Sequence, residues 1–219
     1  RDVMRVPVEP LPGDLFGKML RYSLPVFILS AMVMALGNLD IILVRHYCSE
    51  EESGLYATAA ILGRVALFLP GAFITVLFPE VARAKEKKQV DTRVFWLSLG
   101  LTGLLAGGVS LVCILWPTFV ITLFFGAQYQ DAAPLLQIVS AAMVLLAVAN
   151  VVFTYGLARS NFTFLWPLTA GCFLMCLLIF MFHSSALTIA WMLLFSIMFI
   201  FIGTMGYYLR HLRPSVVIS

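Results

Sequence analysis

Charged residues are scarce in this sequence, and their scarcity excludes an ordinary soluble domain. Only 11% of the 219 residues are Asp, Glu, Lys or Arg, while 62% are hydrophobic. Soluble domains carry about 25% charged residues. The formal net charge is only +3 and no basic stripe is present, so we expect no nucleic-acid partner. The composition therefore predicts a membrane protein with several spanning segments.

Cysteine is also scarce, and the short motifs of common enzymes are missing. The four cysteines lack metal or disulfide spacing, apart from Cys172 and Cys176, which lie one helical turn apart. We interpret all four as small core residues. The sequence contains no Gly-x-Ser-x-Gly, Walker A or His-Glu-x-x-His motif. We therefore predict that the chain is not an enzyme and binds no cofactor and no metal. Without a P-loop, it is not itself the ATPase of a primary pump.

Long apolar runs, by contrast, fill most of the chain. A spanning helix needs about 20 mostly apolar residues, whereas transmembrane strands alternate over segments of about 10 residues. We therefore predict an all-α, polytopic membrane protein with a six-helix bundle in residues 14–213. The spans are expected at residues 16–44, 55–81, 94–116, 134–157, 162–182 and 186–208. Residues 1–13, rich in proline, are predicted to be a linker, and residues 214–219 a tail. Because the chain begins with Arg1 rather than Met, we expect a fragment of a longer protein.

Lysine and arginine gather in alternate loops, which predicts the orientation of the spans. The basic residues lie before or at the start of the first span, surround the turn between the second and third, and follow the fourth and sixth: Arg1, Arg5, Lys18, Arg21, Arg83, Lys85, Lys87, Lys88, Arg93, Arg159, Arg210 and Arg213. The other loops are acidic or neutral and hold only Arg45, at the rim. Because cytoplasmic loops carry the excess of basic residues, both ends of the chain are predicted to be cytoplasmic.

Arg64 is the one unambiguous charge deep inside a predicted span. It lies about 13 Å below the outer end of that span, near the midplane. An arginine there costs roughly 2.5–3.5 kcal/mol on insertion scales. We therefore expect it to face a cavity and bind substrate, although a structural ion pair that seals the bundle is the alternative. The same helical face carries small residues, namely Ala57, Ala60, Gly71 and Thr75.

Asp40 is the predicted partner of Arg64. The loop between their spans is short, so the two helices run antiparallel and both residues lie below the same surface. Arg45 is five positions from Asp40, a spacing that does not form a pair within one helix. We expect Arg45 to reach the lipid headgroups instead.

Three further pairs of residues are candidates for function or packing. Pro70 and Gly71 are predicted to bend the second span, either as a hinge or as a fixed kink. Asn150 and Thr154, one turn apart, form a polar patch that either contacts substrate or joins helices. Gly103 and Gly107 predict a close helix contact.

The order of short motifs resembles that of a known family. The chain carries "NLDIILVRHY", an acidic turn, "GLYATAAILGRVALFLPGAFITVLFPEVARA" and "LFFGAQYQDAAPLLQIVSAAMVL" in that order. This resembles the polysaccharide transporter branch of the multidrug/oligosaccharidyl-lipid/polysaccharide exporter superfamily over residues 15–159. The best individual matches are Gly54-Leu55-Tyr56, Pro79, and Gly126 with Tyr129. The final third departs from the pattern, with "FHSSALTIAWM" where a glycine-rich turn is expected.

The resemblance implies one lobe of a flippase with two six-helix bundles, of which this chain is the second. It implies movement of lipid-linked O-antigen or capsule repeat units across the bacterial inner membrane, through a cavity between the bundles. Its implied partners are membrane lipid, the lipid-linked oligosaccharide, an N-terminal six-helix half and a polysaccharide polymerase complex. In that picture Arg64 attracts the pyrophosphate or acidic sugars, and Asp40 lies near the outward end of the cavity.

Other functions remain open alternatives. A multidrug and toxic compound extrusion antiporter would need an acidic cavity for cations, whereas the deep charge here is basic. A membrane-embedded glycosyltransferase would need a catalytic loop that these short connections do not provide. A noncatalytic membrane scaffold of a polysaccharide assembly complex would use Arg64 only as a structural residue.

Overall fold

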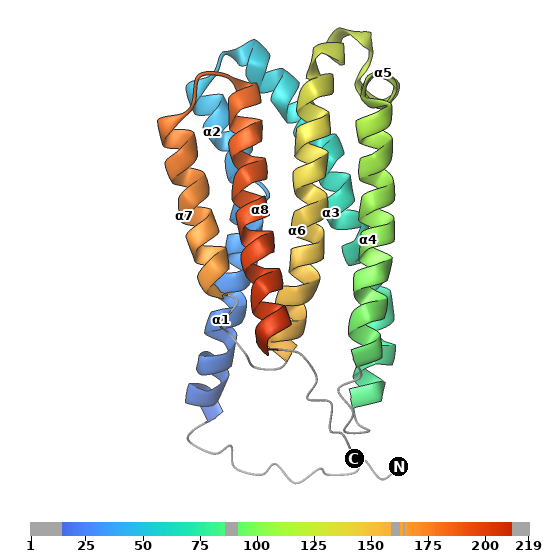
Figure 1. The fold of residues 1–219 in the computed structure, drawn as a ribbon, viewed down its shortest axis with the longest axis vertical. Helices are drawn as coiled ribbons and strands as arrows, with labels where there is room; N and C mark the ends of the chain where they lie inside the picture. Colours follow the sequence, from blue (N-terminus) through green and yellow to red (C-terminus); the bar gives the residue numbers. More distant parts are fainter. Residues whose placement is uncertain (1–14, 86–91, 159–162, 164, 212–219) are drawn as a thin grey trace, which may run out of the picture.

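The computed structural model describes residues 15–85, 92–158, 163 and 165–211, and every regular element in these ranges is a helix (Figure 1). This confirms the all-α class. The predicted linker at residues 1–13 and the tail at 214–219 lie outside the described residues, as do the side chains of the basic residues that predicted the orientation, apart from Arg45. The elements are α1 (Leu15–Leu36), α2 (Leu39–Tyr47), α3 (Glu50–Lys85), α4 (Thr92–Leu115), α5 (Pro117–Phe125), the 3-10 helix η1 (Ala127–Ala132), α6 (Ala133–Ala158), α7 (Leu165–Met181) and α8 (Ala186–His211).

The long helices run up and down as a bundle with α6 at its centre (Figure 1). The most extensive contacts of α6 are with α3, α4 and α8. Leu136, Val139, Met143 and Leu146 of α6 are fully buried. The side chains recur every three or four residues, which places them along one side of the helix. The core of the bundle therefore forms around α6.

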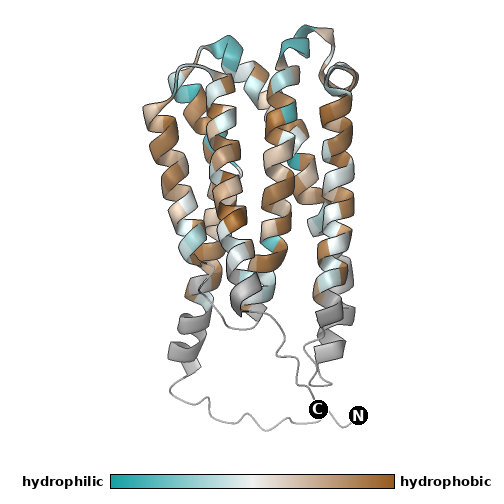
Figure 2. Ribbon diagram, viewed as in Figure 1, coloured by the Kyte–Doolittle hydropathy of each residue, from teal (hydrophilic) through white to brown (hydrophobic). Residues whose placement is uncertain are grey.

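The helices confirm a multi-pass membrane protein. In the described part of the chain, four helices are long and apolar enough to cross a membrane, or five if α1 and α2 form one bent span. Figure 2 shows hydrophobic residues along the middle of the bundle and hydrophilic residues at the end where α2 meets α3 and where η1 lies. The apolar helix α7 has 17 residues, fewer than a typical span. The predicted total of six spans stays a prediction.

The first predicted span is not continuous, which corrects the expected single helix at residues 16–44. The chain breaks between α1 and α2 at Gly37 and Asn38, and the axes on either side of the break differ by 41°. Asn38 has non-helical φ and ψ angles of −140° and −22°, and its side-chain amide donates to the carbonyl of Met34 at 2.8 Å. Glycine and asparagine are both weak helix formers, and asparagine competes for backbone groups in this way. The break places the start of α2 directly before Asp40.

A short helix, α5, occupies part of the predicted loop between residues 116 and 134. Pro117 is at its first turn, where a missing N–H leaves no helical hydrogen bond unmade. Gly126 ends it with a φ angle of 94°, a conformation that glycine adopts without steric strain. Its nine residues, two of them threonine, are too few to predict an element of their own.

Among the described residues, close helix contacts occur at Gly63, Gly171 and Gly203 and not at Gly103 or Gly107, so that prediction is wrong. A Cβ atom added to Gly63 would lie 3.0 Å from a methyl group of Val139 and 3.2 Å from the backbone nitrogen of Ser140. A Cβ atom on Gly103 or Gly107 would meet no described atom within 4 Å. Gly63 therefore lets α3 approach the central helix α6.

Candidate functional site

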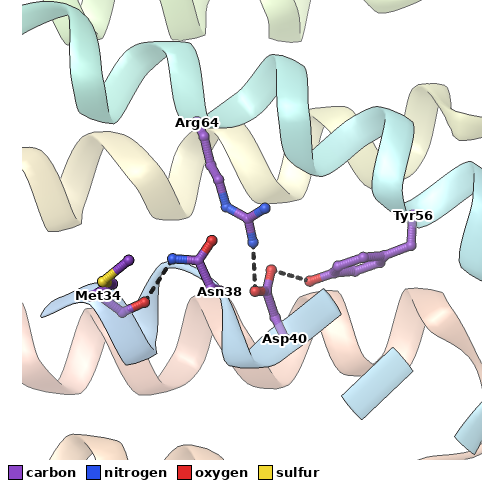
Figure 3. A network of polar contacts seen from close by, with 5 residues as sticks. All are labelled: Met34, Asn38, Asp40, Tyr56 and Arg64. Atoms are coloured by element: carbon purple, nitrogen blue, oxygen red, sulfur yellow. Dashed lines mark hydrogen bonds and ion pairs between the residues drawn. The ribbon is translucent and has the colours of Figure 1, made fainter. Parts of the chain in front are cut away.

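Asp40 is held by two side chains of α3, as Figure 3 shows. Arg64 Nη2 donates to Asp40 Oδ1 at 2.6 Å, and Tyr56 Oη donates to Asp40 Oδ2 at 2.9 Å. Asp40 and Tyr56 have no exposed surface, and 8% of the Arg64 side chain is exposed. The predicted pairing of Asp40 with Arg64 is therefore confirmed, and it forms a buried ion pair with a hydroxyl as the third member.

Local helix geometry brings these three residues together. Tyr56 and Arg64 lie eight positions apart on α3, about two turns or roughly 12 Å along its axis. The long arginine side chain spans much of this distance, so that both residues reach the same carboxylate. Asp40 lies in the first turn of α2. A negative charge is stabilised at that end of a helix by the unpaired backbone N–H groups. The break at Gly37 and Asn38 thus creates a favourable position for Asp40.

Arg64 also lines an open depression on α3. Arg64 Nε is buried and has no hydrogen-bond partner among the described residues. The depression has a volume of about 480 Å³ and is lined by Arg64 and by four apolar side chains of α3, namely Ile61, Val65, Phe68 and Leu69. An arginine has five N–H donors, and the ion pair with Asp40 uses one of them. The site can therefore offer donors to an anion that also has an apolar part.

The walls of the depression differ from the small-residue face expected beside Arg64. Ala60 is fully buried and Ala57 is half-buried, and neither lines the depression. The side chain of Thr75 lies outside the described residues. Large apolar side chains, with Phe68 among them, form the surface that an incoming molecule meets. The reason is that the small residues of α3 face its helical neighbours, where close packing needs them.

Asn150 and Thr154 are not brought to Arg64. The hydroxyl of Thr154 donates to the carbonyl of Asn150 within α6, at 2.8 Å. Gly63 lies beside Ser140 of α6, and α3 and α6 run in the same direction (Figure 1). Asn150 is ten residues beyond Ser140, so it lies roughly 15 Å further along the bundle. The contact of Asn150 and Thr154 with substrate stays a prediction, and it would occur at a position separate from Arg64.

Pro70 and Gly71 lie within α3, which continues from Glu50 to Lys85 without a break. Pro70 is buried and Gly71 is exposed. They come six and seven residues after Arg64, about 9–10 Å along the helix axis. The hinge predicted at these residues is not tested by this single arrangement.

Two contacts at the end of the bundle position α2 and α3 relative to their neighbours. Ser53 Oγ donates to the carbonyl of Val44 at 3.4 Å, which joins the two helices of the site. Tyr47 stacks on His183, between α7 and α8, with ring centroids 4.4 Å apart.

Between α2 and α3, partial burial and the neighbouring Glu52 carboxylate raise the pKa of Cys48 to about 11. The Cys48 thiol therefore stays protonated at neutral pH.

Tyr56 is the member of the site that sequence reasoning missed. The sequence indicated it only as part of the Gly54-Leu55-Tyr56 turn. Its spacing from Arg64 is the signal that could have found it, because residues eight apart lie toward one side of a helix. A tyrosine in a membrane helix usually lies at the interface, which hid its role as a buried donor.

The comparison with protein families places this site in context. The family model of polysaccharide biosynthesis proteins matches residues 4–134, more than half of the chain. The chain belongs to this family. The comparisons with curated proteins and with solved structures found no match. In this polysaccharide biosynthesis protein, Asp40, Tyr56 and Arg64 lie inside the matched segment, whereas Asn150 and Thr154 lie beyond it. The resemblance seen in the motifs is therefore confirmed, and it includes all three residues of the buried network.

Proposed function

We propose that this polysaccharide biosynthesis protein moves a lipid-linked oligosaccharide, such as an O-antigen or capsule repeat unit, across the bacterial inner membrane. The observation that carries the proposal is the position of Arg64. Arg64 is largely buried inside a candidate membrane span, and the same residue lines an apolar depression. A prenyl pyrophosphate combines an anionic group with an apolar chain, and the depression offers a complementary surface to each.

Arg64 binds the pyrophosphate in this proposal, and Asp40 and Tyr56 position it. A guanidinium donates two parallel hydrogen bonds to phosphate oxygens, because its planar group of N–H donors matches the spacing of these oxygens. Asp40 neutralises Arg64 while no substrate is present, which lowers the free energy of an otherwise unpaired buried charge. An incoming pyrophosphate attracts Arg64 and repels the Asp40 carboxylate. Substrate binding therefore favours a conformation in which Arg64 and Asp40 are further apart.

The architecture that we propose is a six-helix lobe in residues 14–213, with α7 as the sixth span. This lobe faces an N-terminal six-helix half of the same protein across a central cavity, and both ends of the present chain are cytoplasmic. The linker at residues 1–13 connects the two halves. The hinge lies at Pro70 and Gly71. A second polar contact with the substrate is formed by Asn150 and Thr154. A polymerase complex then accepts the transported unit. The protein carries out no covalent chemistry and needs no cofactor in this scheme.

A noncatalytic scaffold is the second candidate, and the ion pair itself favours it. Because Asp40 already partners Arg64, the pair also serves as a structural element that joins α2 to α3. A cation antiporter is less well supported, since the Asp40 carboxylate is not available to a cation while it is paired with Arg64 and Tyr56. Transporter and scaffold differ in what happens when both charges are removed together.

The test uses the full-length protein in a strain whose surface polysaccharide depends on it. Arg64→Ala and the double variant Asp40→Asn with Arg64→Gln are compared with Arg45→Ala, an exposed arginine in the neighbouring helix. Surface polysaccharide is measured by immunoblot together with the amount of protein in the membrane. We expect the double variant to lose polysaccharide at normal protein levels and Arg64→Ala to lose both polysaccharide and some of the protein, while Arg45→Ala keeps both. A double variant with normal polysaccharide excludes Arg64 from transport and supports the scaffold.

A further inference from the structure

The short helix α5 lies crosswise to the bundle, at the end of α4 (Figure 1). Trp116 separates the two helices and has non-helical φ and ψ angles of −130° and 54°. The change of direction at this residue turns the chain out of α4. A crosswise helix at the end of a membrane span lies at the depth where the hydrocarbon core gives way to headgroups. The position of α5 thus raises the question of what its outer surface contacts.

Six of the nine side chains of α5 form three groups around the helix, and Phe124 near its end is a further exposed apolar residue. Val120 and Ile121 are buried against the bundle. Phe119 and Leu123 lie four positions apart on an outer edge, and each is 65% exposed. Thr118 and Thr122 lie four positions apart on the adjacent edge and are also exposed. The exposed surface of α5 therefore has an apolar edge beside a polar edge.

The polar edge of α5 continues into η1. Thr122 Oγ1 donates to the carbonyl of Thr118 at 2.7 Å, and Gln130 Nε2 donates to Thr122 Oγ1 at 3.4 Å. Gln130 and its neighbour Asp131 are exposed. A charged, exposed residue such as Asp131 needs water, so this side of the segment faces the aqueous phase.

The apolar edge continues the exposed apolar surface of α4, a candidate membrane span. Leu111, Leu115 and Trp116 are each more than half exposed and lead directly to Phe119 and Leu123. Tryptophan is enriched at the level of the headgroups, where its ring is partly in an apolar and partly in a wet environment. We propose that α5 is an interfacial helix, with Phe119 and Leu123 inserted between the headgroups and acyl chains of the nearest lipid leaflet. Since α5 carries no charged residue, it binds this leaflet through apolar contact and has no preference for anionic lipid.

This proposal depends on the membrane location and not on transport. It assigns α5 the task of holding one end of the bundle at a fixed depth, beside the α2–α3 end that carries Asp40 and Arg64. Amphipathic helices that lie in the plane of the membrane bury their apolar face by about 5–10 Å into the boundary between headgroups and acyl chains. Phe119 and Leu123 should therefore lie at a shallow depth.

The experiment measures the surroundings of each edge in the full-length protein in lipid vesicles. Phe119→Cys and Thr118→Cys are introduced separately after the native cysteines are replaced by serine, and each is labelled with a small fluorescent probe. Lipids with a spin label near the headgroup or deep in the acyl chain quench from within the bilayer, and iodide quenches from water. We expect the probe at residue 119 to be quenched at least twofold more by the shallow lipid label than by the deep one, and less by iodide than the probe at residue 118.

Two outcomes would overturn the proposal. If both probes are quenched equally by iodide and neither by lipid, the apolar edge faces water. If neither quencher reaches residue 119, another part of the protein or a second copy covers it. Leu123→Cys and Thr122→Cys form a second matched pair on the same two edges, which keeps the test decisive if a variant at residue 118 or 119 does not fold.

Discussion

The buried pair of Asp40 and Arg64 makes an asymmetric prediction about stability. The Asp40 carboxylate has no exposed surface. In Arg64→Gln it loses its ionic partner and keeps the hydrogen bond from the Tyr56 hydroxyl. Breaking a buried ion pair by removing one member costs about 3–5 kcal/mol. In Asp40→Asn, the guanidinium loses its counter-ion, but Arg64 keeps 8% of its side chain exposed and lines an open depression that can admit water. We therefore expect Arg64→Gln to be the more destabilising of the two single variants.

The double variant, Asp40→Asn with Arg64→Gln, should be milder than Arg64→Gln alone. It removes both charges, and the two amide side chains can hydrogen-bond to each other and to Tyr56. Residues in direct contact couple by about 0.5–3 kcal/mol in such cycles. For a chain of this length 1 kcal/mol shifts the Tm by roughly 2–4 °C, so Arg64→Gln should lower the Tm by about 6–20 °C.

The assay uses the full-length protein in detergent, fused to a fluorescent protein. Thermal unfolding is monitored by size-exclusion chromatography of this fluorescent fusion. Arg45→Gln is the control, because Arg45 is exposed and a surface change of this kind alters stability by about 0.5 kcal/mol or less. The reasoning is refuted if the double variant loses as much stability as the two single variants added together, since Asp40 and Arg64 would then contribute independently.

Three further changes test other parts of the structure. Tyr56→Phe removes the hydrogen bond to Asp40 but keeps the ring, and should cost about 1.5–3 kcal/mol; an unchanged Tm would show that the hydroxyl does not support the carboxylate. Gly63→Ala should destabilise by about 1–3 kcal/mol because its Cβ would press on Val139 and Ser140, whereas Gly103→Ala, with open space around it, is the matched control and should keep or raise the Tm. Cys48, as the single remaining cysteine, should react slowly with iodoacetamide at pH 8, because burial and Glu52 raise its pKa to about 11 and leave about one thiol in a thousand ionised. Its rate should rise steeply with pH toward 11, and Glu52→Gln should speed the reaction at pH 8; a rate equal to that of a free cysteine contradicts the raised pKa.

Much of the site could be predicted because it depends on distances along single helices. Counting residues from the end of the span placed Arg64 deep in the membrane, and a charge at that depth needs a partner or a cavity. The short loop between the first two spans then brought Asp40 to a matching depth. Tyr56 was missed because the composition of a helix does not say which of its faces meets a neighbour.

Elements that depend on a local competition between weak preferences could not be predicted. The run from residue 16 to 44 is mostly apolar and long enough for one span, so hydropathy alone does not indicate the break at Gly37 and Asn38. Its position depends on the side chain of Asn38 bonding to Met34, a contact with a backbone group. In the same way, α5 is too short to be recognised by length, and it is the burial of Val120 and Ile121 against the bundle that holds it in place.

The sequence by itself determined that this is an all-helical membrane protein of the polysaccharide biosynthesis family with a charge buried in one span. Scarce charge and long apolar runs leave the backbone no alternative but to satisfy its hydrogen bonds within helices in lipid. Only the tertiary structure decided that Tyr56 joins the predicted pair of Asp40 and Arg64, that a close contact lies at Gly63 and not at Gly103, and that Arg64 also lines an apolar depression. These features depend on the rotation of each helix about its axis, which is set by packing against its neighbours.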